Sequence, residues 1–281
     1  ARGKSRHQLI REILEEARLL GESGVREVIL TGVNIGDFGK TTGESFLELI
    51  QALDQIPGIS RYRISSIEPN LLHNDILHFV AQSSKFLPHF HIPLQSGSDQ
   101  ILNKMRRRYR RNLFQEKIRA IRHILPEAFI GADLIVCFPG EDENIFCHTL
   151  EFLQKKEVSY YQVFPFSPRP NTPAYSMNPK ISKTTIKQRS RLVQELAEAK
   201  KQSFYQKNLG QTREVLFEGT IQNGHQLGFT DNYIRVEVPQ EKTLSGSVKK
   251  IYLKEITPSG NVKGVPPYKT PSSKGLEINH D

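Results

Sequence analysis

Apolar residues recur at helical and strand spacing in turn along the first 166 residues. The first helical pattern places Leu9, Ile10, Ile13, Leu14, Ala17 and Leu20 on one face. Further patterns predict strands at 25–31, 62–67, 90–94, 129–137 and 160–166. Helices are expected from 44, from 74, between 99 and 125, and over 142–156. Strands that alternate with helices are typical of βαβ units, so the pattern predicts an α/β fold with a parallel sheet, open or curled into a barrel.

Polar or Gly/Pro-rich segments follow each expected strand, at 31–34, 65–69, 95–98, 139–141 and 167–170. Parallel folds place their active sites at the carboxyl ends of the strands. Because we count five strands and the chain starts on a helix without a Met, we expect a partial parallel barrel whose first strand is missing, cut from a longer protein.

The pattern changes after residue 182. A long basic helix is expected over 183–207, and short strands separated by Asn-Gly, Asp-Asn and Ser-Gly turns follow it. Such turns and strands are typical of a small antiparallel β-barrel. We therefore predict a partial barrel with its trailing helix at 1–206, a small barrel at 207–257, and a disordered tail at 258–281, where apolar content is low.

Composition narrows the class of protein. The 281 residues carry a net charge of +9 and no apolar run long enough to span a bilayer, and we find no targeting signal. Two cysteines are too few for a disulfide scaffold and suit a reducing compartment, so we expect a cytoplasmic protein.

Positive charge is concentrated in one stretch. Nine Lys or Arg and two acidic residues lie between Asp99 and Arg122. Phosphate contacts displace counterions, and an interleaved aromatic ring can stack on a base. We therefore expect RNA to bind the densest part of the stretch, which comprises Lys104, Arg106, Arg107, Arg108, Tyr109, Arg110 and Arg111.

Residues 36–41 end in Gly39-Lys40-Thr41, as a phosphate-binding P-loop does. The position of the first glycine is Asn34, however, and Gly43 interrupts the segment where a helix should begin. We interpret it as a loop at the mouth of the barrel.

Metal ligation has little support in the sequence. Cys137 and Cys147 are ten residues apart and match no common metal spacing. His89 and His91 alternate along an expected strand and should face the same side. We interpret all four as structural residues.

Five segments together resemble the radical-SAM tRNA methylthiotransferases over residues 1–257. They are residues 1–6, 30–34, 91–106, 133–141 and 166–174. Residues 1–6 resemble the segment that follows the CxxxCxxC cluster loop of this family. Cys137 departs from the family pattern, which usually has Gly there. The strands at 210–256 resemble a TRAM domain, a small RNA-binding β-barrel.

The resemblance implies a radical-SAM reaction that adds a methylthio group to C2 of a modified adenosine beside the tRNA anticodon. Residues 63–69 and 32–39 most resemble the branch that acts on N6-threonylcarbamoyladenosine. The implied cofactors are S-adenosylmethionine and [4Fe-4S] clusters, and the implied partners are the anticodon stem-loop of tRNA and an electron-donor protein. Residues expected to contact S-adenosylmethionine are Thr31, Gly32, Ser66, Glu68, Gln95, Ser96 and Asp133.

No cluster cysteine lies where the family would place one, so we expect this chain alone to be inactive in methylthiolation. Four alternatives remain. They are the isopentenyladenosine branch, the branch that modifies a ribosomal protein, a non-catalytic RNA-binding protein, and a parallel-barrel enzyme acting on a phosphorylated metabolite.

Overall fold

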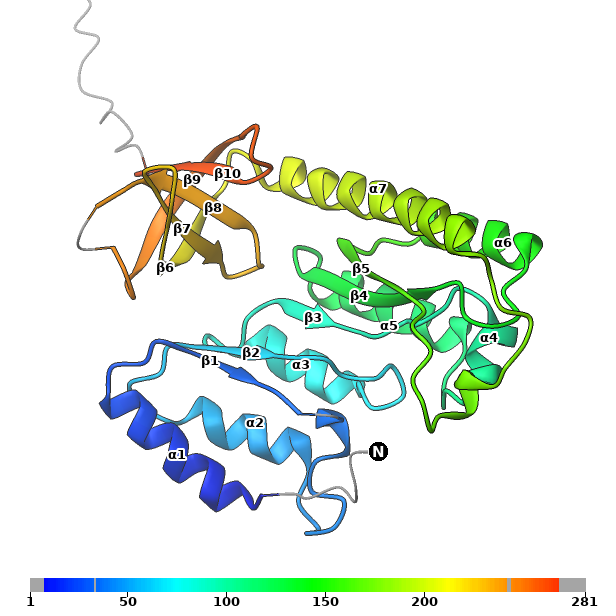
Figure 1. Cartoon of the computed structure of the whole chain (residues 1–281). Helices are drawn as coiled ribbons and strands as arrows, with labels where there is room; N and C mark the ends of the chain where they lie inside the picture. The colour runs from blue at the N-terminus through cyan, green and yellow to red at the C-terminus, as the bar shows by residue number, and fades with distance from the viewer. Residues whose placement is uncertain (1–7, 33, 242–243, 268–281) are drawn as a thin grey trace, which may run out of the picture. The chain divides into compact units, whose positions relative to one another are not determined.

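Five parallel strands in sequence order form the sheet of the N-terminal part. The computed structural model describes residues 8–32, 34–241 and 244–267 (Figure 1). The strands are β1 (Glu27–Leu30), β2 (Arg61–Ile64), β3 (His89–His91), β4 (Phe129–Val136) and β5 (Tyr160–Pro165). β1 pairs with β2, and β4 pairs with both β3 and β5. Parallel bridges from Tyr62 to Phe86 and from Ser66 to His91 connect the two ladders. The predicted parallel sheet and its five strands are confirmed.

Helices connect these strands as the apolar spacing predicts. They are α1 (Ile10–Glu22), α2 (Phe46–Asp54), α3 (Asn74–Gln82), α4 (Asp99–Lys104), α5 (Arg111–Ile124), α6 (Glu143–Gln154) and α7 (Lys183–Asn208), with 3-10 turns η1 (Ile35–Asp37) and η2 (Pro173–Tyr175). Ser45 and Glu48 form a reciprocal capping box that starts α2. Within the described ranges, no helix combines the length and apolarity needed to cross a bilayer.

One hydrophobic cluster lies between the sheet and the helices. It contains alternate residues of β4, Ile130, Ala132, Leu134 and Val136, together with residues from α1, α2, α3, α5, α6 and α7. Side chains at alternate strand positions point to opposite faces, so the other face of the sheet is free to carry polar groups. Helices packed against a single face are typical of a barrel wall rather than of a doubly wound sheet.

The opposite face of the sheet carries a buried ionic cluster. Glu27 of β1 forms an ion pair with Arg61 Nε at 2.8 Å. It also accepts a hydrogen bond from Arg63 Nε at 2.7 Å. Both arginines are 2% exposed. Buried charges are costly unless they are paired, and this pairing joins β1 to β2 on the inner face.

The C-terminal unit starts at Tyr205 by its internal contacts. It consists of β6 (Thr212–Gln222), β7 (His225–Thr230), β8 (Arg235–Pro239), β9 (Val248–Ile256) and β10 (Val262–Val265), which close into a barrel in the order β10-β8-β7-β6-β9. Gly228 of β7 has no room for a side chain, because a Cβ there would lie 2.6 Å from the Leu216 carbonyl oxygen. The predicted small barrel is confirmed.

The prediction that the barrel ends at residue 257 and a disordered tail begins at 258 is wrong for residues 258–267. β10 pairs antiparallel with β9 and parallel with β8, so the barrel is not purely antiparallel. Val262 is fully buried. A four-residue strand gains its stability from two neighbours rather than from its own composition, which is why low apolar content misled the prediction. Residues 268–281 lie outside the described part.

Ending the chain at Thr257 should destabilise the C-terminal unit, because β8 and β9 lose their shared partner and Val262 is removed from the core. We expect the free energy of unfolding to fall by about 3 kcal/mol or more. Urea unfolding followed by circular dichroism measures the change. A chain that ends at Pro267 retains all described strands and is the control. Equal midpoints for the two truncated chains would contradict a closing role for β10.

Candidate cofactor and RNA site

The expected cofactor positions gather at one edge of the sheet, because parallel strands end on the same side. Ser66 forms a bridge to His91, and the Gln95 backbone amide donates to the Asp133 carbonyl oxygen at 2.8 Å. Ser66, Gln95 and Asp133 therefore lie on neighbouring segments. Thr31 and Gly32 follow β1 at the same edge and are exposed.

A tight turn ends the chain segment that continues from β3. Gln95 has a φ of 67°, a left-handed conformation that residues other than glycine rarely adopt. The Ser96 hydroxyl is buried and accepts a hydrogen bond from the Ser98 amide at 3.2 Å. A Cβ on Gly97 would lie 2.8 Å from Thr149 of α6. Gly97 is therefore needed for the turn to pack against α6.

Glu68 already has a cationic partner. Its carboxylate accepts a hydrogen bond from Arg107 Nη1 at 3.2 Å, and both side chains are partly exposed. The next residue, Arg108, lies 4.0 Å from the Asp37 carboxylate in the loop after β1. The basic segment, Lys104–Arg111, thus contacts the loops that follow β1 and β2.

Side chains in the basic segment divide into two groups. Arg106 and Arg108 are exposed. Arg110 donates hydrogen bonds to the Asn103 side chain at 2.8 Å and to backbone carbonyls. The backbone amide of Arg111 donates to the Asp99 carboxylate. Lys104 lies against Gly140 and is half-buried. Exposed guanidinium groups can bind phosphate, whereas the other arginines shape the segment.

Tyr109 does not face solvent, so our prediction that its ring stacks on an RNA base is wrong for this structure. It is 2% exposed, and its hydroxyl donates to the Leu94 carbonyl oxygen at 3.5 Å. Burial raises the pKa of this phenol. The one aromatic residue among the basic residues, Tyr109, anchors the basic segment to the core.

Asp133 is paired on the inner face of the sheet. His91 Nε2 lies 2.9 Å from the Asp133 carboxylate. A Cβ at Gly131 would lie 3.1 Å from His91 Nδ1, so the glycine makes room for the imidazole. The spacing of His89 and His91 predicts their shared face. The partnership with Asp133 depends on strand register, which the sequence did not reveal.

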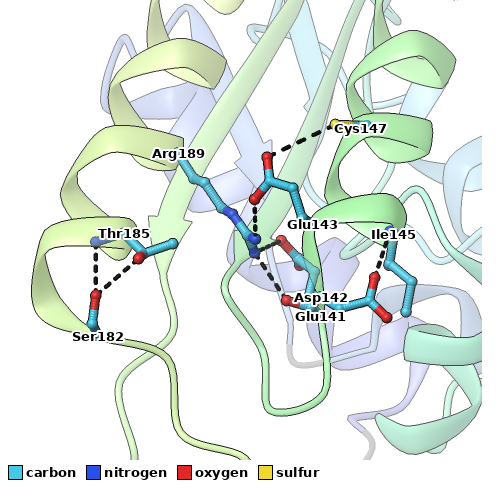
Figure 2. A network of polar contacts seen from close by, with 8 residues as sticks. All are labelled: Glu141, Asp142, Glu143, Ile145, Cys147, Ser182, Thr185 and Arg189. Atoms are coloured by element: carbon cyan, nitrogen blue, oxygen red, sulfur yellow. Dashed lines mark hydrogen bonds and ion pairs between the residues drawn. The ribbon is translucent and has the colours of Figure 1, made fainter.

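A second polar network, at the turn after β4, was missed in the sequence (Figure 2). Arg189 of α7 donates to the Glu141 carbonyl oxygen at 2.9 Å and to the Glu143 carboxylate at 2.7 Å. Its Nη1 also lies 3.6 Å from the Glu141 carboxylate. Asp142 caps α6 by accepting from the Ile145 amide at 2.8 Å. No sequence motif signals a contact between positions 48 residues apart.

The residues of this chain do not fit an iron–sulfur cluster held by three thiolates. Cys137 is buried after β4 and Cys147 is exposed on α6, and the sequence contains no third cysteine. Across the residues that the structure describes, no group of three His, Cys, Asp or Glu could hold a metal ion. Burial also raises the pKa of Cys137 to about 11, which disfavours a thiolate ligand.

The strand ends do fit a polar cofactor such as S-adenosylmethionine. Among the described residues, three of the buried polar atoms that have no hydrogen-bond partner lie near these strand ends: Asn34 Oδ1 after β1, Asn70 Oδ1 after β2, and Arg107 Nε beside Glu68. Buried polar atoms normally have partners, so a ligand that supplied them would be stabilised here. Asn34 lies on the loop that carries Gly32, and Asn70 lies on the loop that carries Ser66 and Glu68. Arg107 contacts this second loop through Glu68.

A half-barrel of parallel strands with polar strand ends defines a class of cofactor-dependent enzyme folds, and comparison identifies the family. The profile of the Radical SAM superfamily matches residues 1–153, and the chain belongs to this superfamily. Among solved structures, the chain is similar to the radical S-adenosylmethionine methyltransferase TsrM from Kitasatospora setae. The TM-score is 0.50 at 11% identity, over 60% of this chain and 33% of that one, which supports the fold alone.

The curated relatives include tRNA methylthiotransferases. The chain is 37% identical over 237 residues to the threonylcarbamoyladenosine tRNA methylthiotransferase MtaB of Aquifex aeolicus (strain VF5), covering 84% of this chain and 57% of that protein. It is 33% identical over 228 residues to the tRNA-2-methylthio-N(6)-dimethylallyladenosine synthase of Acetivibrio thermocellus, covering 80% and 48%. The chain spans about half the length of these relatives. The family resemblance is confirmed.

Glu141 should make stability depend on pH. Burial raises its pKa to about 7 from an ordinary 4.5, although the Cys137 amide and Arg189 oppose the shift. The folded state binds this proton more tightly than the unfolded state. The stability that the proton contributes is therefore complete below pH 4.5 and is lost as the pH rises through 7.

Glu141→Gln should remove about 2 kcal/mol of the stability difference between pH 5 and pH 8, as an order of magnitude. Thermal unfolding across this range measures the difference. Glu151→Gln, an exposed change on α6, is the matched control. An unchanged pH slope in the Glu141 variant would show that another group titrates.

Proposed function

We propose that this chain is the catalytic-barrel and RNA-binding part of a radical SAM tRNA methylthiotransferase. The observation that carries the proposal is the 37% identity over 237 residues to a protein of that activity, a match longer than the N-terminal unit that therefore reaches into the C-terminal one. The partial barrel supplies the cofactor edge, and the C-terminal barrel, which resembles a TRAM domain, supplies an RNA-binding unit. A cytoplasmic location and an external electron-donor protein belong to the same proposal.

S-adenosylmethionine, when bound, supplies the radical chemistry of this superfamily. We propose that it is held by the strand-end residues Thr31, Gly32, Ser66, Glu68, Gln95, Ser96 and Asp133. Glu68 is suited to the α-amino group or to the ribose hydroxyls, because its carboxylate is partly exposed and can accept hydrogen bonds in addition to the one from Arg107. Since this chain does not fit the cluster, we expect it to be inactive alone.

tRNA is the proposed substrate, with contacts at the anticodon stem-loop. Arg106 and Arg108 are exposed, and Arg110 is exposed too but donates to Asn103 and to backbone carbonyls. Lys104 lies beside them at the turn after β4. They border the strand ends where the cofactor would bind. A phosphate backbone held here would bring a nucleotide near that edge.

Replacing Arg106 and Arg108 together with Ala should weaken RNA binding about tenfold at moderate salt and reduce the salt slope by up to about 2, because two phosphate contacts are lost. Fluorescence anisotropy with a labelled anticodon stem-loop at several KCl concentrations measures both effects. The double change Arg11→Ala and Arg18→Ala removes the same charge from exposed positions of α1. Equal weakening by the two double variants would reduce the role of the basic segment to net charge.

The adenosine that is modified is proposed to be N6-threonylcarbamoyladenosine. Three of the relatives at 30–37% identity carry that substrate in their names. A relative at 33% identity is named for the dimethylallyl-modified nucleoside instead, so that branch is the second candidate.

The substrate can be determined with the protein produced together with whatever residues precede Ala1 in its gene. After anaerobic reconstitution with iron, sulfide and S-adenosylmethionine, mass spectrometry of digested tRNA should show a methylthio group on N6-threonylcarbamoyladenosine. The 281-residue chain treated in parallel should give no product. Product on the dimethylallyl nucleoside would select the other branch. No product with a loaded cluster would favour a non-catalytic RNA-binding protein.

A further inference from the structure

Arg189 of α7 connects several parts of the turn that follows β4. It is 6% exposed, whereas the other charged residues of α7 are exposed or partly exposed. Its guanidinium contacts the carbonyl oxygen and the carboxylate of Glu141, the carboxylate of Glu143 and the ring of Phe146 at 4.7 Å (Figure 2). It also interacts with the Cys137 thiol.

The turn itself needs support. Cys137 has a φ of 66°, in the left-handed region, which is strained for a residue with a side chain. Its backbone amide interacts with the Glu141 carboxylate. The Glu141 amide in turn donates to the Phe138 carbonyl oxygen at 3.0 Å. Arg189 thus reaches the strained residue through Glu141.

Simple helix packing does not explain a buried arginine at this position. Elsewhere α7 packs with small or apolar residues, Val193 and Ala197, which are almost fully buried. A buried guanidinium is costly unless its geometry is well satisfied, and removal of one partner leaves a charge unpaired. An arginine that contacts two carboxylates and a carbonyl oxygen of one turn is suited to fixing that turn.

We propose that Arg189 is a positioning residue that reaches from α7, through Glu141, to hold the turn after β4 in the form that borders the cofactor edge of the sheet. This rests on the proposed function for the identity of the cofactor. The helix is then part of the wall that shapes the cofactor edge, in addition to leading into the C-terminal unit. Lys104 lies against Gly140 of the same turn, so the turn also supports the basic segment.

The two cysteines allow a direct test. With Cys147 replaced by Ser, the only thiol is that of Cys137, which is 2% exposed. We expect Arg189→Met to increase its rate of reaction with a disulfide reagent such as DTNB by about tenfold or more, since the turn opens more often. Arg189→Lys should give an intermediate rate.

Electrostatics alone would change the rate in the opposite direction. Arg189 lowers the pKa of Cys137, against the stronger effect of burial, so loss of the charge without opening of the turn makes the thiolate rarer. An unchanged or slower reaction in folded Arg189→Met would overturn the proposal. Arg191→Met, two residues along the same helix at an exposed position paired with Glu195, is the control and should keep the wild-type rate.

Protein folding is checked by circular dichroism, and if Arg189→Met does not fold, Arg189→Lys decides by the same rate criterion. Calorimetric titration with S-adenosylmethionine then tests the link to the cofactor. We expect affinity at least about fivefold weaker in the Arg189 variant than in the Arg191 control. Absence of binding by the unmodified chain would count against the cofactor assignment, whereas the thiol rates still decide the role of Arg189.

Discussion

Burial of a single face of the parallel sheet is the constraint on which the rest of the N-terminal unit depends. The helices cover one side of the strands, and the alternation of side chains sends Glu27, Arg63, His91 and Asp133 to the other. Because the strands are parallel, their polar ends meet along one edge. A polar edge therefore follows from the packing of the core and needs no additional framework.

The basic segment contains both residues that anchor it to the core and residues that face solvent. Tyr109 anchors it to the core, and Arg110 and Arg111 satisfy neighbouring backbone and acidic groups. The anchoring leaves the Arg106 and Arg108 side chains exposed, whereas the exposed Arg110 is held by hydrogen bonds to Asn103 and to backbone carbonyls. A count of charges alone cannot make this distinction, because exposure depends on contacts with the loops after β1 and β2.

Much of the architecture could be predicted from the sequence. Apolar periodicity placed each strand within a few residues, and strand-end composition indicated the edge of the sheet where we propose that the cofactor binds. The failures share a physical cause. The pairing of β10 with β8, the Tyr109 contact, the His91–Asp133 pair and the Arg189 network all depend on partners that are not sequence neighbours. Local pattern carries no information on such partners, and the roles of the seven cofactor positions stay predictions for the same reason.

Closure of the C-terminal barrel by β10 has a practical consequence. Sheet edges with unpaired amides and carbonyls template association between chains, and a closed barrel offers none along its ring. Affinity tags or fusion partners are therefore best joined after Pro267. A junction within Val262–Val265 would open the barrel and expose an unpaired strand edge.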